Sequence, residues 1–251
     1  MVRLAIEWDK LEKAPTIRLL PGERRRERVL TFGEETVYLE SARNVGQSIL
    51  EKYTRALEGI RATQRGELPT KPADPFLLWD VAIVLLDCGL RPEECYQLRW
   101  EHVRDNVLHI PFGKTANVRR SIPLPKRVEG VLEIRRASRP RSGCFQQPTK
   151  SGHIEQSTLK KRLVAASDLA GLQRFPFYTF RHTCLTRWAA HMDPYTLAYL
   201  AGHSDFSTTR RYVHPNLEAG RAAMEKANSA RSWHSAETVV VITTPGLAVV
   251  A

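Results

Sequence analysis

The fold is decided by the stretch Leu200-Ala201-Gly202-His203-Ser204-Asp205-Phe206-Ser207-Thr208-Thr209-Arg210-Arg211-Tyr212. Apolar residues predict a short helix from Pro194 to Ala201 and another from Ser207 to about Val213. His203 then lies in a tight turn between two helices, and Tyr212 follows it by nine residues. A histidine at such a turn is usually a helix cap or a core hydrogen-bond partner, and a single tyrosine usually packs half buried. The stretch predicts a helical fold, while its chemistry depends on the rest of the chain.

Two arginines stand in two further stretches, Gly89-Leu90-Arg91-Pro92-Glu93-Glu94 and Phe180-Arg181-His182-Thr183. Gly89 ends a strongly apolar helix predicted from Phe76 to Cys88, and the bend can project Arg91 out of the core. Glu94 lies three residues on, one turn along the next helix, where it can orient Arg91 by a salt bridge. That helix is predicted to run from Glu93 to Trp100, with proline in its first turn.

In this order, the stretches resemble the tyrosine recombinase family of phage integrases and Xer-type recombinases. The resemblance runs from about the start of the chain to about Ala227. It implies an enzyme that breaks and rejoins DNA through a 3′-phosphotyrosyl intermediate. No cofactor is implied, because the phosphotyrosyl bond conserves the energy of the phosphodiester.

The resemblance also assigns chemical roles. Arg91 and Arg181 hold the scissile phosphate, since a planar guanidinium grips two phosphate oxygens and keeps its charge. His203 hydrogen-bonds the phosphate or assists proton transfer. Tyr212 is the nucleophile, whose phenol, with an ordinary pKa near ~10, loses its proton during attack.

The departing 5′ oxygen needs a proton donor, and Lys114 is the candidate. Short strands are predicted at Val107–Ile110 and 121–124, and they place Lys114 near the turn of a β-hairpin. A turn lysine is usually only solvated, but the family carries its catalytic lysine on such a hairpin. Basic residues near the motifs are candidates for contacts with backbone phosphate rather than for chemistry: Arg119, Arg120, Arg210 and Arg211.

The chain departs from the family at Tyr178. Members usually have a histidine three residues before the second arginine, and Tyr178 stands there before Arg181. A phenol can hydrogen-bond a phosphate oxygen but does not act as a base near neutral pH. We therefore expect a weaker pH dependence between about pH 5 and 7 than a histidine would give.

The predicted fold class is mostly α with a small antiparallel β-sheet, as in the family's catalytic domain. Further helices are expected at 31–57, 126–137, 157–169, 180–191 and 217–227. The expected organisation is a linker-like basic segment at 1–30, a catalytic domain at 31–227 and a tail at 228–251. The tail is either loosely packed or docks on a neighbouring subunit.

Composition supports this interpretation. The 251 residues are 42% hydrophobic and carry a net charge of +11, which favours a nucleic-acid partner. There is no signal peptide or membrane-length apolar run, and the four cysteines form no C-x-x-C pair, so a reduced cytoplasmic protein is expected. The histidines and cysteines lack the spacing of a zinc site, so no metal is expected.

About 30 residues precede the catalytic pattern, so the family's N-terminal clamp domain is expected to be absent. The chain alone would then bind DNA weakly and recombine poorly. The resemblance implies double-stranded DNA as partner and a homotetramer on it. Two alternatives remain: a non-catalytic DNA-binding remnant, and relaxation of DNA like a type IB topoisomerase. The target sequence and the choice among phage integration, chromosome-dimer resolution and element mobility stay open.

Overall fold

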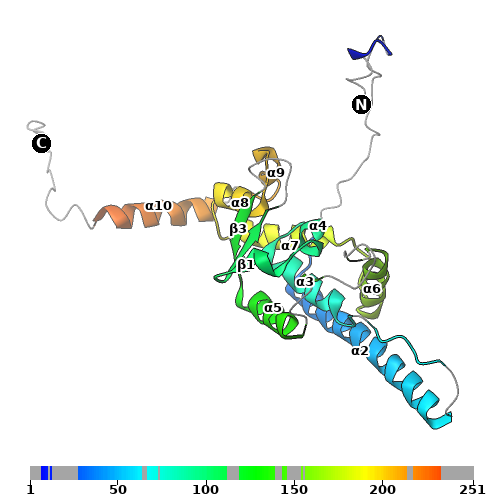
Figure 1. The fold of residues 1–251 in the computed structure, drawn as a ribbon. Coiled ribbons are helices and arrows are strands. Elements are labelled where there is room, and N and C mark those ends of the chain that lie inside the picture. The colour runs from blue at the N-terminus through cyan, green and yellow to red at the C-terminus, as the bar shows by residue number, and fades with distance from the viewer. Residues whose placement is uncertain are drawn as a thin grey trace, which may run out of the picture. The chain divides into compact units, whose positions relative to one another are not determined.

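The computed structural model describes residues 7–10, 12, 28–63, 67–72, 74–111, 119–138, 143–145, 154, 156–213 and 217–232. The chain divides into two compact units. Figure 1 labels the helices and strands that they contain. The first is formed by Met1–Ala82 and Gln156–Thr183, and the second by Ile83–Glu155 and Cys184–Ala251. Helices α3 (Leu77–Cys88) and α7 (Tyr178–Ala189) each begin in the first unit and end in the second. A single catalytic domain over 31–227 stays a prediction.

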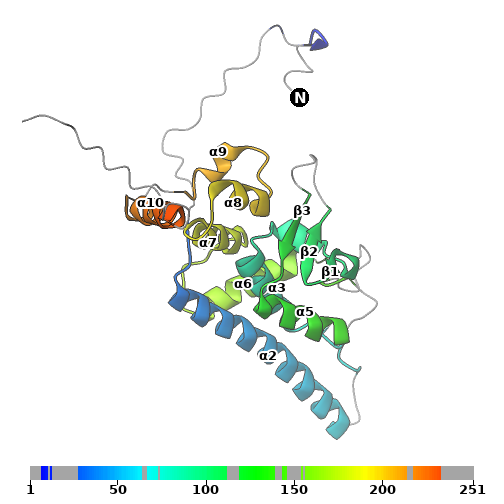
Figure 2. The same ribbon diagram turned by 90° about the vertical axis from the view of Figure 1, so that its left-hand side faces the viewer.

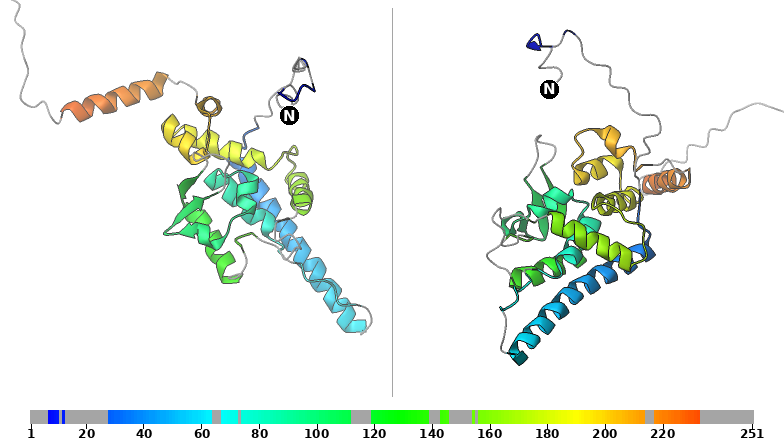
Figure 3. Two further views of the ribbon diagram at one scale, coloured as in Figure 1. Left: turned by 45° about the horizontal axis from the view of Figure 1, so that its top comes forward. Right: turned by 90° about the vertical axis from the view of Figure 1, so that its right-hand side faces the viewer.

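The first unit is built on the long helix α2 (Phe32–Thr63), against which α6 (Gln156–Leu169) packs (Figure 3). The predicted start of α2 is confirmed. Thr31 Oγ1 accepts a hydrogen bond from the Glu34 amide at 3.1 Å, and the Glu34 carboxylate accepts one from the Thr31 amide at 2.9 Å. Reciprocal bonds of this kind satisfy amides that the helix itself leaves open.

The second unit contains a three-stranded antiparallel sheet in the order β1 (Val103–Arg104), β2 (Val107–Ile110) and β3 (Arg120–Pro123) (Figure 2). Leu108 pairs with Ile122, and both are buried, so one face of the sheet joins the core. The fold class and the strands β2 and β3 are confirmed. Strand β1 was not predicted, because two residues are too short for a period-2 pattern to show.

The helices of this unit differ from the prediction in two places. They are α4 (Pro92–Tyr96), the 3-10 helix η1 (Trp100–His102), α5 (Lys126–Ser138), α8 (Pro194–Ala201), α9 (Phe206–Thr209) and α10 (Leu217–Ser232). The helix expected from Glu93 to Trp100 ends at Tyr96, where the Leu98 carbonyl accepts from the Cys144 amide instead of from a helical partner. The helix expected to reach about Val213 ends at Thr209, which places Tyr212 in a turn.

The remaining predictions concern five further helices and the C-terminal tail. Helices α5, α6, α7, α8 and α10 agree with the predicted ranges to within three residues, except at the end of α10. The expected tail at 228–251 lies outside the described residues apart from the last turn of α10. None of the described helices is both long and apolar enough to cross a membrane.

Candidate active site

The turn after α8 is fixed by backbone hydrogen bonds at both of its residues. Gly202 has φ +63° and ψ +46°, the left-handed conformation that favours glycine at a helix end. The Gly202 amide donates to the Tyr199 carbonyl and the His203 amide to the Ala198 carbonyl, both at 3.0 Å. His203 therefore leaves the helix in a defined direction, as the sequence predicts for a tight turn.

His203 and Tyr212 lie together in the second unit. Their ring centroids are 6.0 Å apart with an interplanar angle of 17°. The His203 Nδ1 atom lies 2.9 Å from the hydroxyl of Thr209, which is fully buried and orients the imidazole. Tyr212 is only 8% exposed and packs with Leu185, Leu197 and Ala201. The structure thus brings the predicted histidine and nucleophile side by side.

Arg91 joins this group through Gly202. One terminal nitrogen, Nη2, donates to the Gly202 carbonyl at 2.8 Å, which is the peptide group that precedes His203. The other, Nη1, donates to Glu94 Oε1 at 2.8 Å, while the Arg91 amide donates to Oε2 at 2.8 Å. The predicted salt bridge between Arg91 and Glu94 is present.

Arg120 lies on the same carboxylate, and this corrects its predicted role. Its side chain has no exposed surface and pairs with Glu94 at 2.8 Å. It also donates through Nε to the Leu200 carbonyl at 2.7 Å. A guanidinium that is buried and paired in this way does not lie on the surface where a phosphate contact was expected. Period-2 alternation in β3 would have signalled this, because Arg120 shares a face with the buried Ile122.

The electrostatics of the cluster favour an ionised carboxylate. Burial by itself raises the pKa of Glu94, but hydrogen bonding and charge from Arg120, followed by Arg91, outweigh it and hold the pKa below its usual range. Thr209 is the residue that sequence reasoning missed. Its signal is weak: a threonine six residues after a histidine has no distinctive pattern.

The first unit holds two more of the predicted site residues. Arg181 has no exposed surface, and its guanidinium carbon lies 6.0 Å from the centroid of the Tyr178 ring. Tyr178 is the first residue of α7 and is 47% exposed. The backbone-contact candidates Arg119, Arg210 and Arg211 are exposed in the second unit. Lys114 lies outside the described residues.

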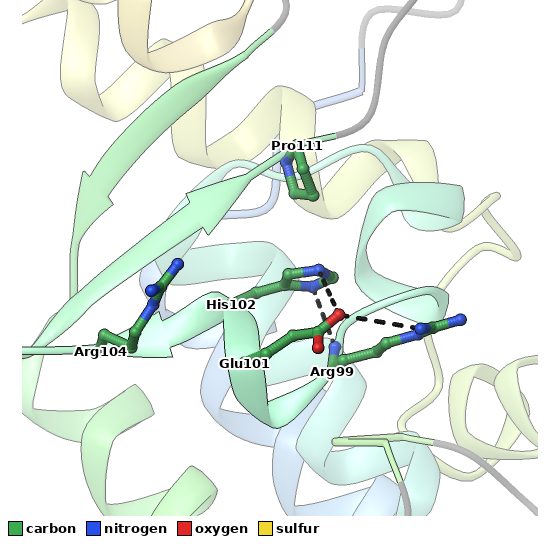
Figure 4. A pocket seen from close by; sticks show the side chains of 5 residues that line it. All are labelled: Arg99, Glu101, His102, Arg104 and Pro111. Atoms are coloured by element: carbon green, nitrogen blue, oxygen red, sulfur yellow. Dashed lines mark hydrogen bonds and ion pairs between the residues drawn. The ribbon is translucent and has the colours of Figure 1, made fainter.

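A separate open cavity of about 650 Å³ lies beside the sheet of the second unit (Figure 4). It is lined by Arg99, Glu101, His102, Arg104 and Pro111. The Glu101 carboxylate lies 3.7 Å from the Arg99 guanidinium and 3.6 Å from the His102 ring, so it already forms an ion pair with Arg99. Of the predicted site residues that the structure describes, none lines this cavity. Within the described ranges, no group of three or more histidine, cysteine, aspartate or glutamate side chains is placed to hold a metal ion.

Comparison with known proteins identifies the family. Residues 71–219 match the model of the phage integrase family. The chain belongs to this family. The matched segment contains every residue of the arginine, histidine and tyrosine stretches described above.

Among the relatives of this chain, two named tyrosine recombinases match over part of their length. The tyrosine recombinase XerD of Lacticaseibacillus casei is 31% identical over 170 residues, which is 62% of this chain and 57% of the relative. The tyrosine recombinase XerC of Caldanaerobacter subterraneus subsp. tengcongensis is 27% identical over 164 residues, 61% of this chain and 46% of the relative. The chain thus spans about half the length of these relatives.

The fold is shared with solved structures of the same kind. The integrase of the transposon Tn1549, in complex with transposon right end DNA, superposes with a TM-score of 0.62 at 19% identity. The match covers 89% of this chain and 74% of that one. At this identity the likeness concerns the fold alone, and it agrees with the mostly helical architecture predicted from the sequence.

Proposed function

We propose that this chain is a site-specific DNA recombinase of integrase type that acts through a 3′-phosphotyrosyl intermediate. The observation that carries the proposal is the stacking of His203 on Tyr212 beside a turn that Arg91 binds. The relatives are named recombinases, and the structural neighbour was solved with DNA, which supports DNA as the substrate.

In the proposed reaction, the Tyr212 oxygen attacks phosphorus. A bond forms between that oxygen and phosphorus, the bond from phosphorus to the 5′ oxygen breaks, and the 5′ oxygen leaves as a hydroxyl after gaining a proton. Arg91 and Arg181 would neutralise the charge that grows on the phosphoryl oxygens. Lys114 would supply the proton to the leaving group, and Tyr178 would hydrogen-bond the phosphate.

His203 would manage the proton of the nucleophile. Its Nδ1 lies 2.9 Å from the Thr209 hydroxyl, which orients the imidazole beside the Tyr212 ring. Exchange follows when the 5′ hydroxyl of one strand attacks the phosphotyrosyl bond of another. Several such sites must act together, so we include a homotetramer on DNA in the proposal.

Covalent trapping tests this function. The protein is incubated with a pool of nicked duplexes, in which the short fragment diffuses away after cleavage and leaves the adduct, with Tyr212→Phe as the matched variant. An adduct for the wild type alone supports the proposal. Binding at low salt without an adduct favours the DNA-binding remnant, and adducts that relax plasmid without joining two sites favour the topoisomerase alternative.

A further inference from the structure

Arg120 holds two separate parts of the second unit at once. Its terminal nitrogens Nη1 and Nη2 donate to the two Glu94 oxygens at 3.0 Å and 2.8 Å. Its Nε donates to the Leu200 carbonyl at 2.7 Å, which lies at the C-terminal end of α8. One buried side chain on β3 therefore ties the start of α4 to the end of α8.

The guanidinium also lies directly against Gly202. A Cβ atom built on Gly202 would lie 2.7 Å from Arg120 Nη1, closer than real Cβ atoms come to a neighbour, and 3.0 Å from Cζ. Gly202 therefore serves two needs, the left-handed backbone and room for Arg120. The turn before His203 is shaped around this arginine.

Both ends of this connection reach residues of the proposed chemistry. Glu94 accepts a hydrogen bond from Arg91 Nη1, and Arg91 Nη2 donates to the Gly202 carbonyl at 2.8 Å. The next residue is His203, whose ring stacks on Tyr212. All three guanidinium nitrogens of Arg120 donate to protein acceptors, Glu94 and the Leu200 carbonyl, so its contacts are with the residues around the site.

We propose that Arg120 is a positioning residue, which orients Arg91 through Glu94 and holds the His203 turn through the end of α8. The inference rests on the proposed function for the roles of Arg91 and His203. Its structural part, the orientation of these two side chains, stands independently of any reaction. Geometry of this kind matters because a misplacement of about 1 Å can slow catalysis about 100-fold.

The charges around Glu94 give the proposal a second consequence. The charged side chains that face Glu94 are Arg91, from the bend before α4, and Arg120, from β3, and the thiol of the adjacent Cys95 is close. Arg120 contributes most to lowering the Glu94 pKa. Loss of this arginine raises the pKa, so Glu94 becomes protonated, and releases Arg91, at a higher pH than in the wild type.

The test uses Arg120→Lys and Arg120→Met. Lysine keeps the charge but lacks the fork that reaches Glu94 and Leu200 together. Arg127→Met is the control. Arg127 forms a similar two-point pair with Asp87, in which both nitrogen–oxygen distances are 2.6 Å, and neither residue belongs to the proposed site. Thermal unfolding first checks that each variant folds; if the methionine variant does not, the lysine variant carries the test.

The first readout is NMR of the free protein, with labelled glutamate and histidine. We expect a raised Glu94 pKa and shifted His203 ring signals in the Arg120 variants, and neither change in Arg127→Met. Folded Arg120 variants with wild-type Glu94 and His203 signals overturn the proposal. This readout needs no DNA, so it decides the structural part even if the wild type forms no adduct and the proposed function fails.

The second readout is the rate of adduct formation against pH. We expect a rate of adduct formation about 100-fold lower in Arg120→Lys and an unchanged Kd for DNA. On the acid side of the pH profile, the fall in rate should begin at a higher pH than in the wild type. If Arg120 only stabilised the fold, its substitution would lower the amount of active protein without shifting the pH at which the rate falls. A lower rate with the wild-type pH midpoint therefore contradicts a positioning role.

Discussion

The Glu94 carboxylate accepts hydrogen bonds from both terminal nitrogens of Arg120, at 3.0 Å and 2.8 Å, in a pair with almost no exposed surface. The same carboxylate accepts two more from Arg91. Two guanidinium groups and one carboxylate leave one net positive charge in the cluster. The carboxylate therefore orients Arg91 without cancelling the positive charge of the cluster.

Glu94→Gln should strongly destabilise the protein. The substitution leaves Arg120 buried without its counter-ion, which costs about 3–5 kcal/mol of unfolding free energy for a buried pair. Urea denaturation at pH 7 measures the change. Asp168→Asn is the control, since Asp168 pairs with Arg174 in an exposed setting and its loss should leave stability unchanged. Equal effects of the two substitutions would contradict the assigned importance of the buried cluster.

The pH dependence of stability follows from the same carboxylate. The folded-state pKa of Glu94 lies below its unfolded value, so its contribution is fully present above the unfolded pKa of about 4.3 and is lost as pH falls through the folded pKa. The unfolding free energy of the wild type should therefore fall more steeply between about pH 5 and 3 than that of Glu94→Gln. Parallel curves for the two proteins would show that Glu94 does not titrate as described.

Gly202→Ala should cost more than Gly171→Ala. Both glycines have positive φ, +63° and +65°, so both substitutions carry about 1–2 kcal/mol of backbone strain. A Cβ on Gly171 meets nothing within 4 Å, whereas one on Gly202 lies 2.7 Å from Arg120. Chemical denaturation measures the loss of unfolding free energy in each variant. The difference between the two losses gives the cost of the contact with Arg120, because the backbone strain is common to both. Equal losses would mean that Arg120 moves away freely.

Tyr178→His should make cleavage more sensitive to pH. An imidazole titrates near pH ~6.5, whereas a phenol stays neutral across the range from 5 to 7. Tyr178 is half exposed at the start of α7, so the exchange should leave the fold intact. Adduct formation measured from pH 5 to 7 checks this. An unchanged pH profile in the variant would show that Tyr178 does not weaken the pH dependence of cleavage.

Much of the fold could be predicted because local signals are strong. Gly89 ends α3, Thr31 and Glu34 cap α2, and the apolar stretch from Pro194 forms α8. What failed depends on tertiary contacts: the helix after Pro92 stops early because Leu98 bonds to the segment around Cys144. No local pattern reports a partner that lies far along the chain.

The candidate site shows the same division. Arg91, His203 and Tyr212 could be named from short stretches, and the structure gathers these three in one unit. Arg120 was placed on the wrong surface, because a basic residue near a hairpin turn usually faces solvent. Alternation along β3 places Arg120 on the same face as the buried Ile122, and the structure adds the carboxylate that pairs with it there.

The most direct test of the account is to identify which tyrosine carries the DNA. Adducts trapped on nicked duplexes are digested with nuclease and protease, and the peptide that retains a nucleotide is located by mass spectrometry. Tyr195 and Tyr199 serve as internal controls, since both belong to the same unit and are far more exposed than Tyr212, at 78% and 52% against 8%. We expect the nucleotide on Tyr212. A nucleotide on either exposed tyrosine, or an adduct that persists in Tyr212→Phe, would contradict it.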